Sequence, residues 1–512
     1  MSRDQLEGFP FHTAQMNITR SKVTIGAGQI DLVDALSSSE SYVSTSINVD
    51  IRYLGCKAHE DQPNFDNYTL LSNAITQGIP LLVPLGKTFL SDGALPVITG
   101  TRISGGGQSS SIKLADGANT HVFYSATAVT DVRMASFKID GNKANQTAGT
   151  NARGIYLLGN SGRIFLDDLR IEDVLDHGVF FSATVTDWVN GPGFDSVVSR
   201  CIGKNCGSSA HTTAGGAGGT AFAGGCLSTR WLGCTGRGNR LNGFKGSGQY
   251  QNCQSIGNNS GFETGFNSSD VKTGTTYINC LAYGNGVGFR NQGEQDELTM
   301  VGCRAEANGG SGVDIVGSVR AITISDHISK NNGTGTGPFS SPVRVNNVSG
   351  MDGISIIDNL STTSSVLLRG VRCFDDQDTK TQQYGVYVEQ NYNHIDIDGS
   401  CDIDGNLTGA IFLNTAATSR SISMRGHIKG LSSSNRDFTA VTLTGSTSAS
   451  DLIVKSVLPV DIPVGGTLVM KCSGTVTGTA GNKLVRSNVN GNLTLLINQA
   501  SADVQDWAVD LR

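Results

Sequence analysis

Short segments in which hydrophobic and polar residues alternate run through most of the chain. Before residue 200 they include ASFKIDG, GIYLLG and HGVFFS, and after residue 320 they include AITISDHI, GVYVEQ and AVTLTG. Such alternation is typical of a β-strand with one buried face. Gly, Asn, Asp and Ser separate the segments, and these residues favour turns. The pattern therefore predicts an all-β chain built from many short strands.

A repeat stands in the middle of the chain. Its copies are CTGRGNRLNGFKG, CQSIGNNSGFETG, CLAYGNGVGFRNQ and CRAEANGGSGVDI. They begin, at intervals of 19, 27 and 23 residues, at Cys234, Cys253, Cys280 and Cys303. Each copy has an asparagine five residues after its cysteine, then a glycine, a large apolar residue and a charged residue. The register is fixed inside the repeat, while the rest of each copy varies in length.

Repeats of this length without helical periodicity are typical of a parallel β-helix, with one turn of the helix per copy. Leucine-rich repeats have a similar length, but the regular leucines that they need are absent from this sequence. We expect the cysteines to point inward and to stack as small buried hydrophobic residues. We expect the asparagines at turns, where they bond backbone groups along the stack and tolerate a left-handed conformation.

One early segment, DQPNFDNYTLLSNAITQG, has helical rather than alternating spacing. Four apolar residues form one face of this predicted helix: Leu70, Leu71, Ala74 and Ile75. Asn64 or Asp66 is placed to cap its start, and Gly78 to end it. The open end of a β-helix exposes the core, and an amphipathic helix laid across it would cover the core. We therefore predict a capping α-helix.

Composition narrows the function classes. The 512 residues include 66 glycines, carry a formal charge of −6 and are 38% hydrophobic, which excludes a disordered chain. A nucleic-acid partner is not expected because no basic run occurs. Membrane insertion is not expected either, because no window approaches 18 apolar residues. The start lacks the apolar stretch of a signal peptide, which indicates synthesis in a cytoplasm. The eleven cysteines contain no CxxC, and neither disulfides, a metal nor a cofactor is predicted.

Two segments carry a family resemblance. YLGCKAHEDQPNFDNYTLLSNAITQGIPLLVPLGKTFL and KIDGNKANQ resemble the opening turns of the pectate-lyase-like, single-stranded right-handed β-helices, in particular phage tailspikes and capsule depolymerases. The resemblance covers roughly residues 51–330 and concerns the cap and the repeats rather than catalytic motifs. It implies a right-handed helix and a homotrimer at a phage tail. It also implies that the protein binds or cuts a bacterial surface polysaccharide.

Three parts are expected along the chain. The polar, Ser-rich residues 1–50 would be an anchor or stem that docks on a phage tail or baseplate protein. Residues 51–450 would form the β-helix. Residues 451–512 would form a small C-terminal β-domain with a hairpin near Ala480-Gly481-Asn482, suited to capping and trimerisation.

A charged residue follows the large apolar residue in each of the four copies. These residues, here called the charged column, are Lys245, Glu263, Arg290 and Asp314. The apolar residues point inward, so alternation places the charged ones on the outer face, about 4.8 Å apart from turn to turn. Two interpretations remain: a salt-bridge ladder that avoids like charges, or the floor of a glycan groove. The longest insertions follow Glu263 and Arg290, and variable loops collect on binding faces.

Glycoside hydrolysis needs two carboxyl groups, which lie about 6.5–9.5 Å apart in inverting enzymes. Glu263 and Asp314 are two turns apart, about 9.6 Å at the backbone. We expect Arg290 between them to lower both pKa values, which suits a base better than an acid. Three further carboxylates on adjoining loops are candidates for the acid: Asp270, Glu294 and Asp296.

A polysaccharide lyase is the other chemistry. A base removes a proton next to a carboxylate that a cation neutralises, but no spacing singles out the residues. The candidates for substrate binding are Lys245, Arg290, Tyr250 and Tyr283, with Tyr277 as a further one.

Two other acidic segments are candidate sites. The first, IEDVLDHG, contains Glu172, Asp173, Asp176 and His177, and a turn beside an exposed strand edge is its alternative interpretation. The second, HIDIDGSCDIDG, contains Asp396, Asp398, Asp402 and Asp404. Their spacing fits a carboxyl pair or a calcium ion, with a solvated outer face as the alternative.

Three functions remain open. The first is a virion tailspike that depolymerises a capsule, exopolysaccharide or O-antigen, by hydrolysis or elimination. The second is a non-catalytic receptor-binding tail fibre of the same fold. The third is a β-helix protein outside any virus, which the missing export signal disfavours.

Overall fold

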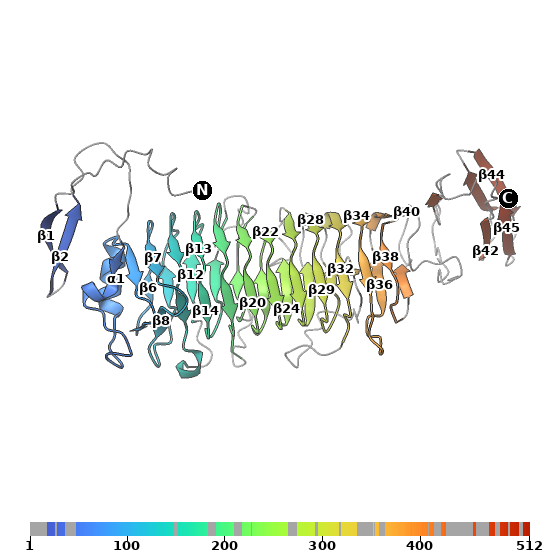
Figure 1. Cartoon of the computed structure of the whole chain (residues 1–512). Helices are drawn as coiled ribbons and strands as arrows, with labels where there is room; N and C mark the ends of the chain where they lie inside the picture. Colours follow the sequence, from blue (N-terminus) through green and yellow to red (C-terminus); the bar gives the residue numbers. More distant parts are fainter. Residues whose placement is uncertain are drawn as a thin grey trace, which may run out of the picture.

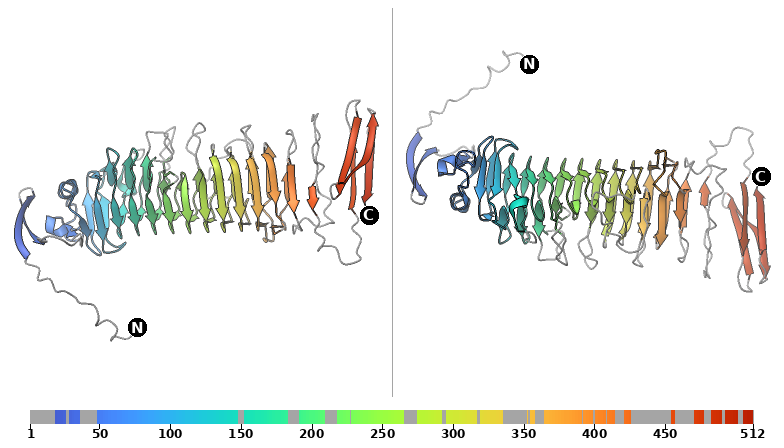
Figure 2. Two further views of the ribbon diagram at one scale, coloured as in Figure 1. Left: turned by 90° about the horizontal axis from the view of Figure 1, so that it is seen from above. Right: turned by 90° about the horizontal axis from the view of Figure 1, so that it is seen from below.

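The computed structural model describes the residues 18–25, 28–35, 48–147, 152–182, 191–208, 218–226, 228–264, 274–291, 295–316, 319–334, 352, 354–357, 364–390, 392–398, 400–407, 409–413, 421–425, 454–456, 470–476, 482–489, 492–500 and 505–511. Three parallel sheets wind around one axis, and each complete turn contributes one strand to each sheet, with additional strands of the first sheet at the two ends (Figure 1). Every strand pairs in parallel with its counterpart one turn on, so the strands stack along the length of the molecule (Figure 2). The predicted parallel β-helix is confirmed.

Sheet 1 contains fifteen strands. They are β3 (Val49–Asp50), β4 (Leu81–Val83), β7 (Arg102–Gly105), β10 (Arg133–Ala135), β13 (Phe165–Asp167), β16 (Val197–Ser199), β19 (Arg230–Leu232), β22 (Gly248–Gln251), β25 (Thr275–Ile278), β28 (Gln295–Val301), β31 (Val319–Ser325), β34 (Ser364–Arg369), β37 (Tyr392–Ile397), β40 (Ser421–Arg425) and β41 (Val454–Ser456).

Sheets 2 and 3 contain twelve strands each. Sheet 2 is made of β5 (Thr88–Ser91), β8 (Ser111–Leu114), β11 (Lys138–Asp140), β14 (Arg170–Glu172), β17 (Ile202–Lys204), β20 (Thr235–Arg237), β23 (Gln254–Ile256), β26 (Leu281–Tyr283), β29 (Arg304–Glu306), β32 (Ile328–Lys330), β35 (Arg372–Phe374) and β38 (Asp402–Ile403). Sheet 3 is made of β6 (Leu95–Pro96), β9 (Phe123–Ser125), β12 (Ile155–Leu158), β15 (Val179–Ser182), β18 (Phe222–Ala223), β21 (Asn242–Lys245), β24 (Ser260–Thr264), β27 (Val287–Asn291), β30 (Val313–Ile315), β33 (Ile354–Ile357), β36 (Tyr384–Gln390) and β39 (Gly409–Leu413).

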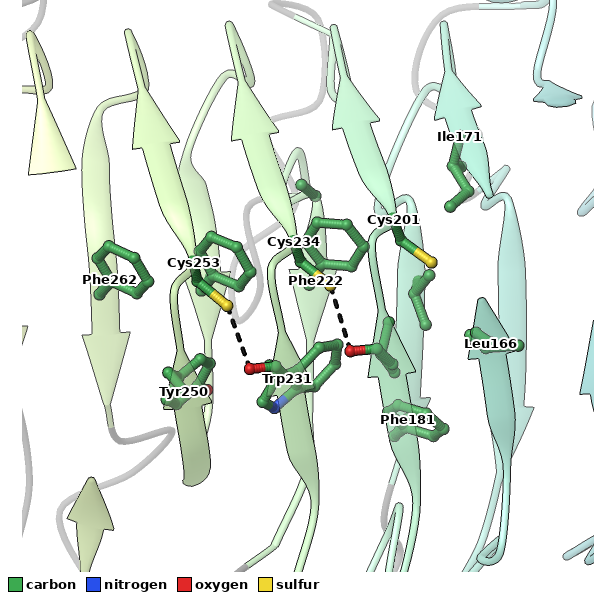
Figure 3. Packing of buried hydrophobic residues seen from close by; sticks show 14 of the residues in the cluster. Leu166, Ile171, Phe181, Cys201, Phe222, Trp231, Cys234, Tyr250, Cys253 and Phe262 are labelled. Carbon is green, nitrogen blue, oxygen red and sulfur yellow. Dashed lines mark hydrogen bonds between the residues drawn. The ribbon is translucent and has the colours of Figure 1, made fainter. Parts of the chain in front are cut away.

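The repeat cysteines form a buried ladder at the entrance to sheet 2, as predicted. Cys234 and Cys253 lie in the core beside stacked aromatic rings (Figure 3). Their thiols donate to backbone carbonyls of neighbouring turns, Cys234 Sγ to Val198 O at 3.3 Å and Cys253 Sγ to Trp231 O at 3.2 Å. The ten cysteines whose side chains the structure describes are all buried and form no disulfide.

This burial predicts slow thiol chemistry. We expect Cys234, Cys253, Cys280 and Cys303 to resist a maleimide reagent until the protein unfolds, because all four thiols are buried in the core and out of its reach. Mass spectrometry after timed labelling measures this directly. A Ser109→Cys variant, at an exposed position, is the positive control. Rapid labelling of the four ladder cysteines in the native protein would show that the register is wrong.

The repeat asparagines form a second ladder. Asn258 Oδ1 accepts from Asn239 N at 2.7 Å and from Asn239 Nδ2 at 2.9 Å. The same pattern links Asn258 to Asn285 and Asn285 to Asn308, which confirms bonding along the stack. The left-handed conformation, however, falls on the residue before each asparagine, such as Gly257 with φ of 64°. Glycine occupies that position in three copies and Ala307 in the fourth, so the asparagine itself needs no strained backbone.

The predicted capping helix is α1 (Tyr68–Thr76), which lies at the N-terminal end of the β-helix (Figure 1). Leu71, Ala74 and Ile75 are buried in the common core. Asn67 occupies the N-cap position, and Asp66 Oδ1 accepts from Tyr68 N at 2.9 Å, so Asp66 rather than Asn64 bonds the start of the helix. Two short 3₁₀ helices are also present, η2 (Ile51–Leu54) and η3 (Lys143–Asn145). No helix among the described residues is long and apolar enough to cross a membrane.

Strands also occur near both ends of the chain. The N-terminal segment contains the antiparallel pair β1 (Ile18–Ile25) and β2 (Gly28–Ala35), which the sequence pattern did not predict. At the C-terminal end, β42 (Met470–Val476) pairs with β45 (Gln505–Leu511), and β43 (Asn482–Val489) pairs with β44 (Asn492–Ala500). The hairpin is thus formed by β43 and β44. β42 and β43, which flank Ala480–Asn482, do not pair with each other, so the hairpin lies further along the chain than the sequence pattern predicts.

Candidate functional site

The charged column exists as predicted on the outer face of sheet 3. Lys245, Glu263, Arg290 and Asp314 lie on β21, β24, β27 and β30, and each is paired in register with the next. The residues just before them in the chain, such as Phe262 and Phe289, are buried in the core. Strand alternation therefore turns the four charged side chains outward.

The column forms two ion pairs. Lys245 Nζ lies 3.0 Å from Glu263 Oε1, and Arg290 Nε lies 3.7 Å from Asp314 Oδ2. The side chains are recessed, with 10% of Glu263 and 15% of Asp314 exposed. This face is therefore a row of largely desolvated charges, where electrostatic effects are stronger than at an open surface.

Arg290 lowers the pKa of Asp314 as expected, but the larger effect of burial was not foreseen. Burial raises the pKa of Asp314 to about 6, and the attraction of Arg290 offsets this only in part. A carboxyl group with such a pKa is partly protonated near neutral pH and can act as a general acid.

A second buried carboxyl group, Asp352, was missed in the sequence. It precedes β33, the strand next to Asp314, and accepts a hydrogen bond from Tyr384 N at 3.2 Å. Burial raises the pKa of Asp352 to about 7, and the negative charge of Asp314 adds to this effect. The signal was available, because GMDGISI aligns with GGSGVDI one turn earlier.

Two predicted substrate-binding tyrosines lie elsewhere. Tyr250 is buried in the core, where its ring stacks on Trp231 and Tyr277, and its hydroxyl donates to Gly246 O at 3.0 Å (Figure 3). Tyr250 therefore cannot line an outer surface, because it occupies an inward position of β22. Tyr283 is 46% exposed, but it lies on β26 of sheet 2 and so faces away from the charged column.

Of the three carboxylates predicted as loop acids, the structure describes only Asp296. Asp296 lies at the start of β28 in sheet 1 and pairs with Arg320 at 2.5 Å. It is therefore engaged with a neighbouring turn of sheet 1. Asp270 and Glu294 lie outside the described residues.

The segment IEDVLDHG divides between two faces. Glu172, on sheet 2, forms ion pairs with Arg170 and Lys138. Burial by itself would raise the pKa of Glu172, but the hydrogen bonds and charges of those two cations lower it on balance. Asp176 instead lies beside sheet 3, where it pairs with Arg153.

The aspartates of HIDIDGSCDIDG also divide, because Asp396 lies on β37 of sheet 1 and Asp402 on β38 of sheet 2. Asp396 and Asp402 therefore do not share a face as a carboxyl pair, because their strands belong to different sheets. A surface hollow of about 200 Å³ lies at the sheet 2 end and is lined by Arg372, Phe374, Asp375, Asp402, Asp404 and Gly405. Within the described part of the chain, no group of three His, Cys, Asp or Glu side chains is arranged to hold a metal ion.

Comparisons with solved structures identify the class of fold. The tailspike protein gp49 from Pseudomonas phage LKA1 matches with a TM-score of 0.52 at 13% identity, covering 86% of this chain and 88% of that one. The Dettilon tailspike protein gp208 matches with a TM-score of 0.51 at 12% identity, covering 87% and 75%. The pre-mature bacteriophage phi29 gene product 12 matches with a TM-score of 0.52 at 14% identity, covering 74% of this chain.

This chain spans 52% of the length of that phi29 protein, and 65% of its N-terminal fragment. No protein-family model and no curated protein sequence matches the chain. The three structural matches show that it is a right-handed parallel β-helix protein. The predicted resemblance to phage tailspikes is thus confirmed for the fold.

Proposed function

We propose that the protein is a phage tailspike that binds and depolymerises a bacterial surface polysaccharide, and that the charged column is its active site. The observation that carries this proposal is the contrast between its two carboxyl groups. Asp314 has its pKa raised to about 6 by burial, whereas Glu263 forms an ion pair with Lys245. One face thus holds an acid and a carboxylate two turns apart, about 9.6 Å at the backbone.

In this proposal Asp314 donates a proton to the oxygen of the glycosidic bond as that bond breaks. Glu263 accepts a proton from a water molecule that attacks the sugar carbon from the opposite side. Arg290 holds Asp314 in place, and Lys245 orients Glu263. The backbone spacing of about 9.6 Å is near the upper limit for inverting enzymes and well above the separation of about 5–5.5 Å in retaining ones, which favours inversion at the sugar carbon. A lyase would instead leave an unsaturated, ultraviolet-absorbing sugar end, so the products distinguish the two reactions.

A non-catalytic tail fibre is the second candidate function. The two ion pairs of the column favour it, because each charge already has a partner. Purified protein spotted on lawns of encapsulated bacteria tests the difference. A halo of stripped capsule supports depolymerisation, whereas binding without a halo across a broad panel supports the tail fibre.

The fold likeness to tailspikes also supports a homotrimer at the virion tail. The N-terminal segment would dock on a tail or baseplate protein, and the C-terminal strands would assist trimerisation. We expect a mass three times that of the 53.6 kDa chain in analytical ultracentrifugation at micromolar concentration. A mass of one chain would contradict the trimer.

The two buried carboxyl groups predict how stability depends on pH. The pKa values of Asp314 and Asp352 are raised from 3.8 to about 6 and about 7. The folded state therefore binds these protons more tightly than the unfolded state. Their contribution to the free energy of unfolding is complete below about pH 4 and is lost as the pH rises through about 7.

Urea unfolding between pH 4 and 8 measures this slope, and Asp352→Asn should flatten it. Asp61→Asn, at an exposed ion pair with Lys87, is the control and should leave the slope unchanged. An unchanged slope in Asp352→Asn would show that this carboxyl group is not buried in its charged form.

A further inference from the structure

Sheet 3 carries a second cluster, three turns before Glu263. On its outer face Tyr124, Tyr156 and Phe180 are paired in register, and their rings form a stack with centroids 5.4 and 5.6 Å apart. The same register continues from Phe180 through Ala223 to Lys245. The aromatic stack and the charged column are therefore one continuous line of outward residues.

Arg153 lies against this stack. Its Cζ is 4.2 Å from the centroid of the Tyr156 ring and 4.4 Å from that of Phe180. Its Nε donates to Asp176 Oδ2 at 2.6 Å. The Arg153 side chain is 14% exposed and that of Asp176 is 1% exposed. The guanidinium is thus fixed by a buried carboxylate and two rings, with little rotamer freedom left to lose on binding a ligand.

The remaining donors of Arg153 are available. Among the described residues, its Nη1 and Nη2 groups donate to no protein acceptor. Asp176 cannot contact a ligand itself, because Gly218 packs directly over it and a Cβ at that position would lie 1.7 Å from Asp176 Oδ1. Asp176 therefore acts as a positioning residue for Arg153.

The imidazole of His121, beside Arg153, adds no positive charge near neutral pH. His121 Nδ1 accepts from Arg153 N at 3.2 Å, and burial together with nearby Arg153 lowers the pKa of His121 to about 4. His177 lies on the other side, 3.5 Å from Asp176 Oδ1. The chemistry of the cluster is that of one fixed guanidinium fork beside aromatic rings, which matches a carboxylate or phosphate on a sugar.

We infer that Arg153 is the anion-binding group of a glycan subsite, and that the polysaccharide recognised by this face carries an acidic sugar. This inference rests on the proposed function and specifies its substrate class. Phe180 and Glu263 are three turns apart, about 14 Å along the axis. A single glycan chain that follows the outer face of sheet 3 reaches both the subsite and the carboxyl groups.

The experiment measures binding of full-length protein to purified capsular polysaccharides, both acidic and neutral. Each acidic polymer is tested before and after chemical reduction of its carboxyl groups, and before and after removal of its phosphates. Glu263→Gln is present throughout to prevent cleavage. Arg153→Gln is made together with Asp176→Asn, so that no carboxylate is buried alone, and Asp176→Asn alone is compared.

We expect the bound polymers to be acidic. When the carboxyl or phosphate groups of the polymer are removed, its binding to protein that retains Arg153 should weaken by about 10- to 100-fold. Arg153→Gln with Asp176→Asn should show the same loss and become insensitive to that removal. Sensitivity to carboxyl reduction identifies a uronate, and sensitivity to phosphate removal identifies a phosphate. Arg163→Gln, at an exposed pair with Asp131, should bind as the parent does.

Binding of neutral polymers only would overturn the inference, as would an Arg153 variant that remains as sensitive to loss of the anion as the parent. Neither result contradicts the proposed depolymerisation, because cleavage is measured separately with protein that retains Glu263. Absence of binding to every polymer would overturn the proposed function, and this inference with it. Melting temperatures of the variants confirm that each remains folded.

Discussion

Replacing Glu263 with Gln is expected to reduce glycan cleavage by about 10²- to 10⁴-fold, the usual contribution of a general acid or base. Glutamine keeps the size of the side chain but cannot accept the proton of the attacking water. The reducing ends released from the sensitive polysaccharide measure the rate. Binding should change little. The melting temperature should fall somewhat, because Glu263 is only 10% exposed and the substitution removes the carboxylate 3.0 Å from Lys245 Nζ.

Glu306 provides a matched control on another face. It lies on β29 of sheet 2, forms an ion pair with Arg304 at 2.5 Å and lies 4.0 Å from Lys330 Nζ. Glu306→Gln removes a carboxylate from a similar ladder without touching sheet 3, so cleavage should persist. Full activity in Glu263→Gln would eliminate the charged column as the active site. Equal losses in both variants would indicate a general effect on folding instead.

The alignment of the repeat was sufficient to predict the β-helix, both ladders and the charged column. These features depend on one residue per turn at a fixed register, which the intervals between cysteines and asparagines disclose. The same alignment also indicates that the Tyr250 side chain points into the core. It stands three residues before its cysteine, as do Trp231, Tyr277 and Met300 before theirs, and all four are buried. The repeat alignment alone therefore predicts that Tyr250 is buried, in conflict with its predicted role in substrate binding.

Other features could not be predicted because they depend on contacts between distant segments. The raised pKa of Asp314 reflects how deeply its turn is covered, and spacing carries no information on that. Arg153 and Asp176 are 23 residues apart, on different turns, and neither has a repeat partner of the same type. The division of Asp396 and Asp402 between two sheets depends on where the chain turns a corner.

The second large effect concerns the asparagine ladder. Asn258→Ala is expected to lower the free energy of unfolding by about 2–6 kcal/mol, because each buried group left without a partner costs about 1–3 kcal/mol. Asn258 is fully buried, and its loss removes the acceptor for Asn239 N. It also removes the donor to Gly236 O at 2.9 Å. Alanine therefore leaves two backbone groups of the preceding turn, Asn239 N and Gly236 O, without these partners in a buried place that water cannot reach.

Urea unfolding followed by circular dichroism measures this loss, with Gln254→Ala as the control on the same turn. Gln254 is exposed on β23, so its truncation should change stability by less than about 0.5 kcal/mol. The asparagine ladder connects each turn to the next by hydrogen bonds. Asn258→Ala therefore weakens the contact between successive turns and is not only a local change. Proteolysis should then cleave near Asn258 before it cleaves the parent protein anywhere in that region. A stability equal to that of Gln254→Ala would show that the ladder is dispensable and that the aromatic and cysteine stacks alone hold the turns together.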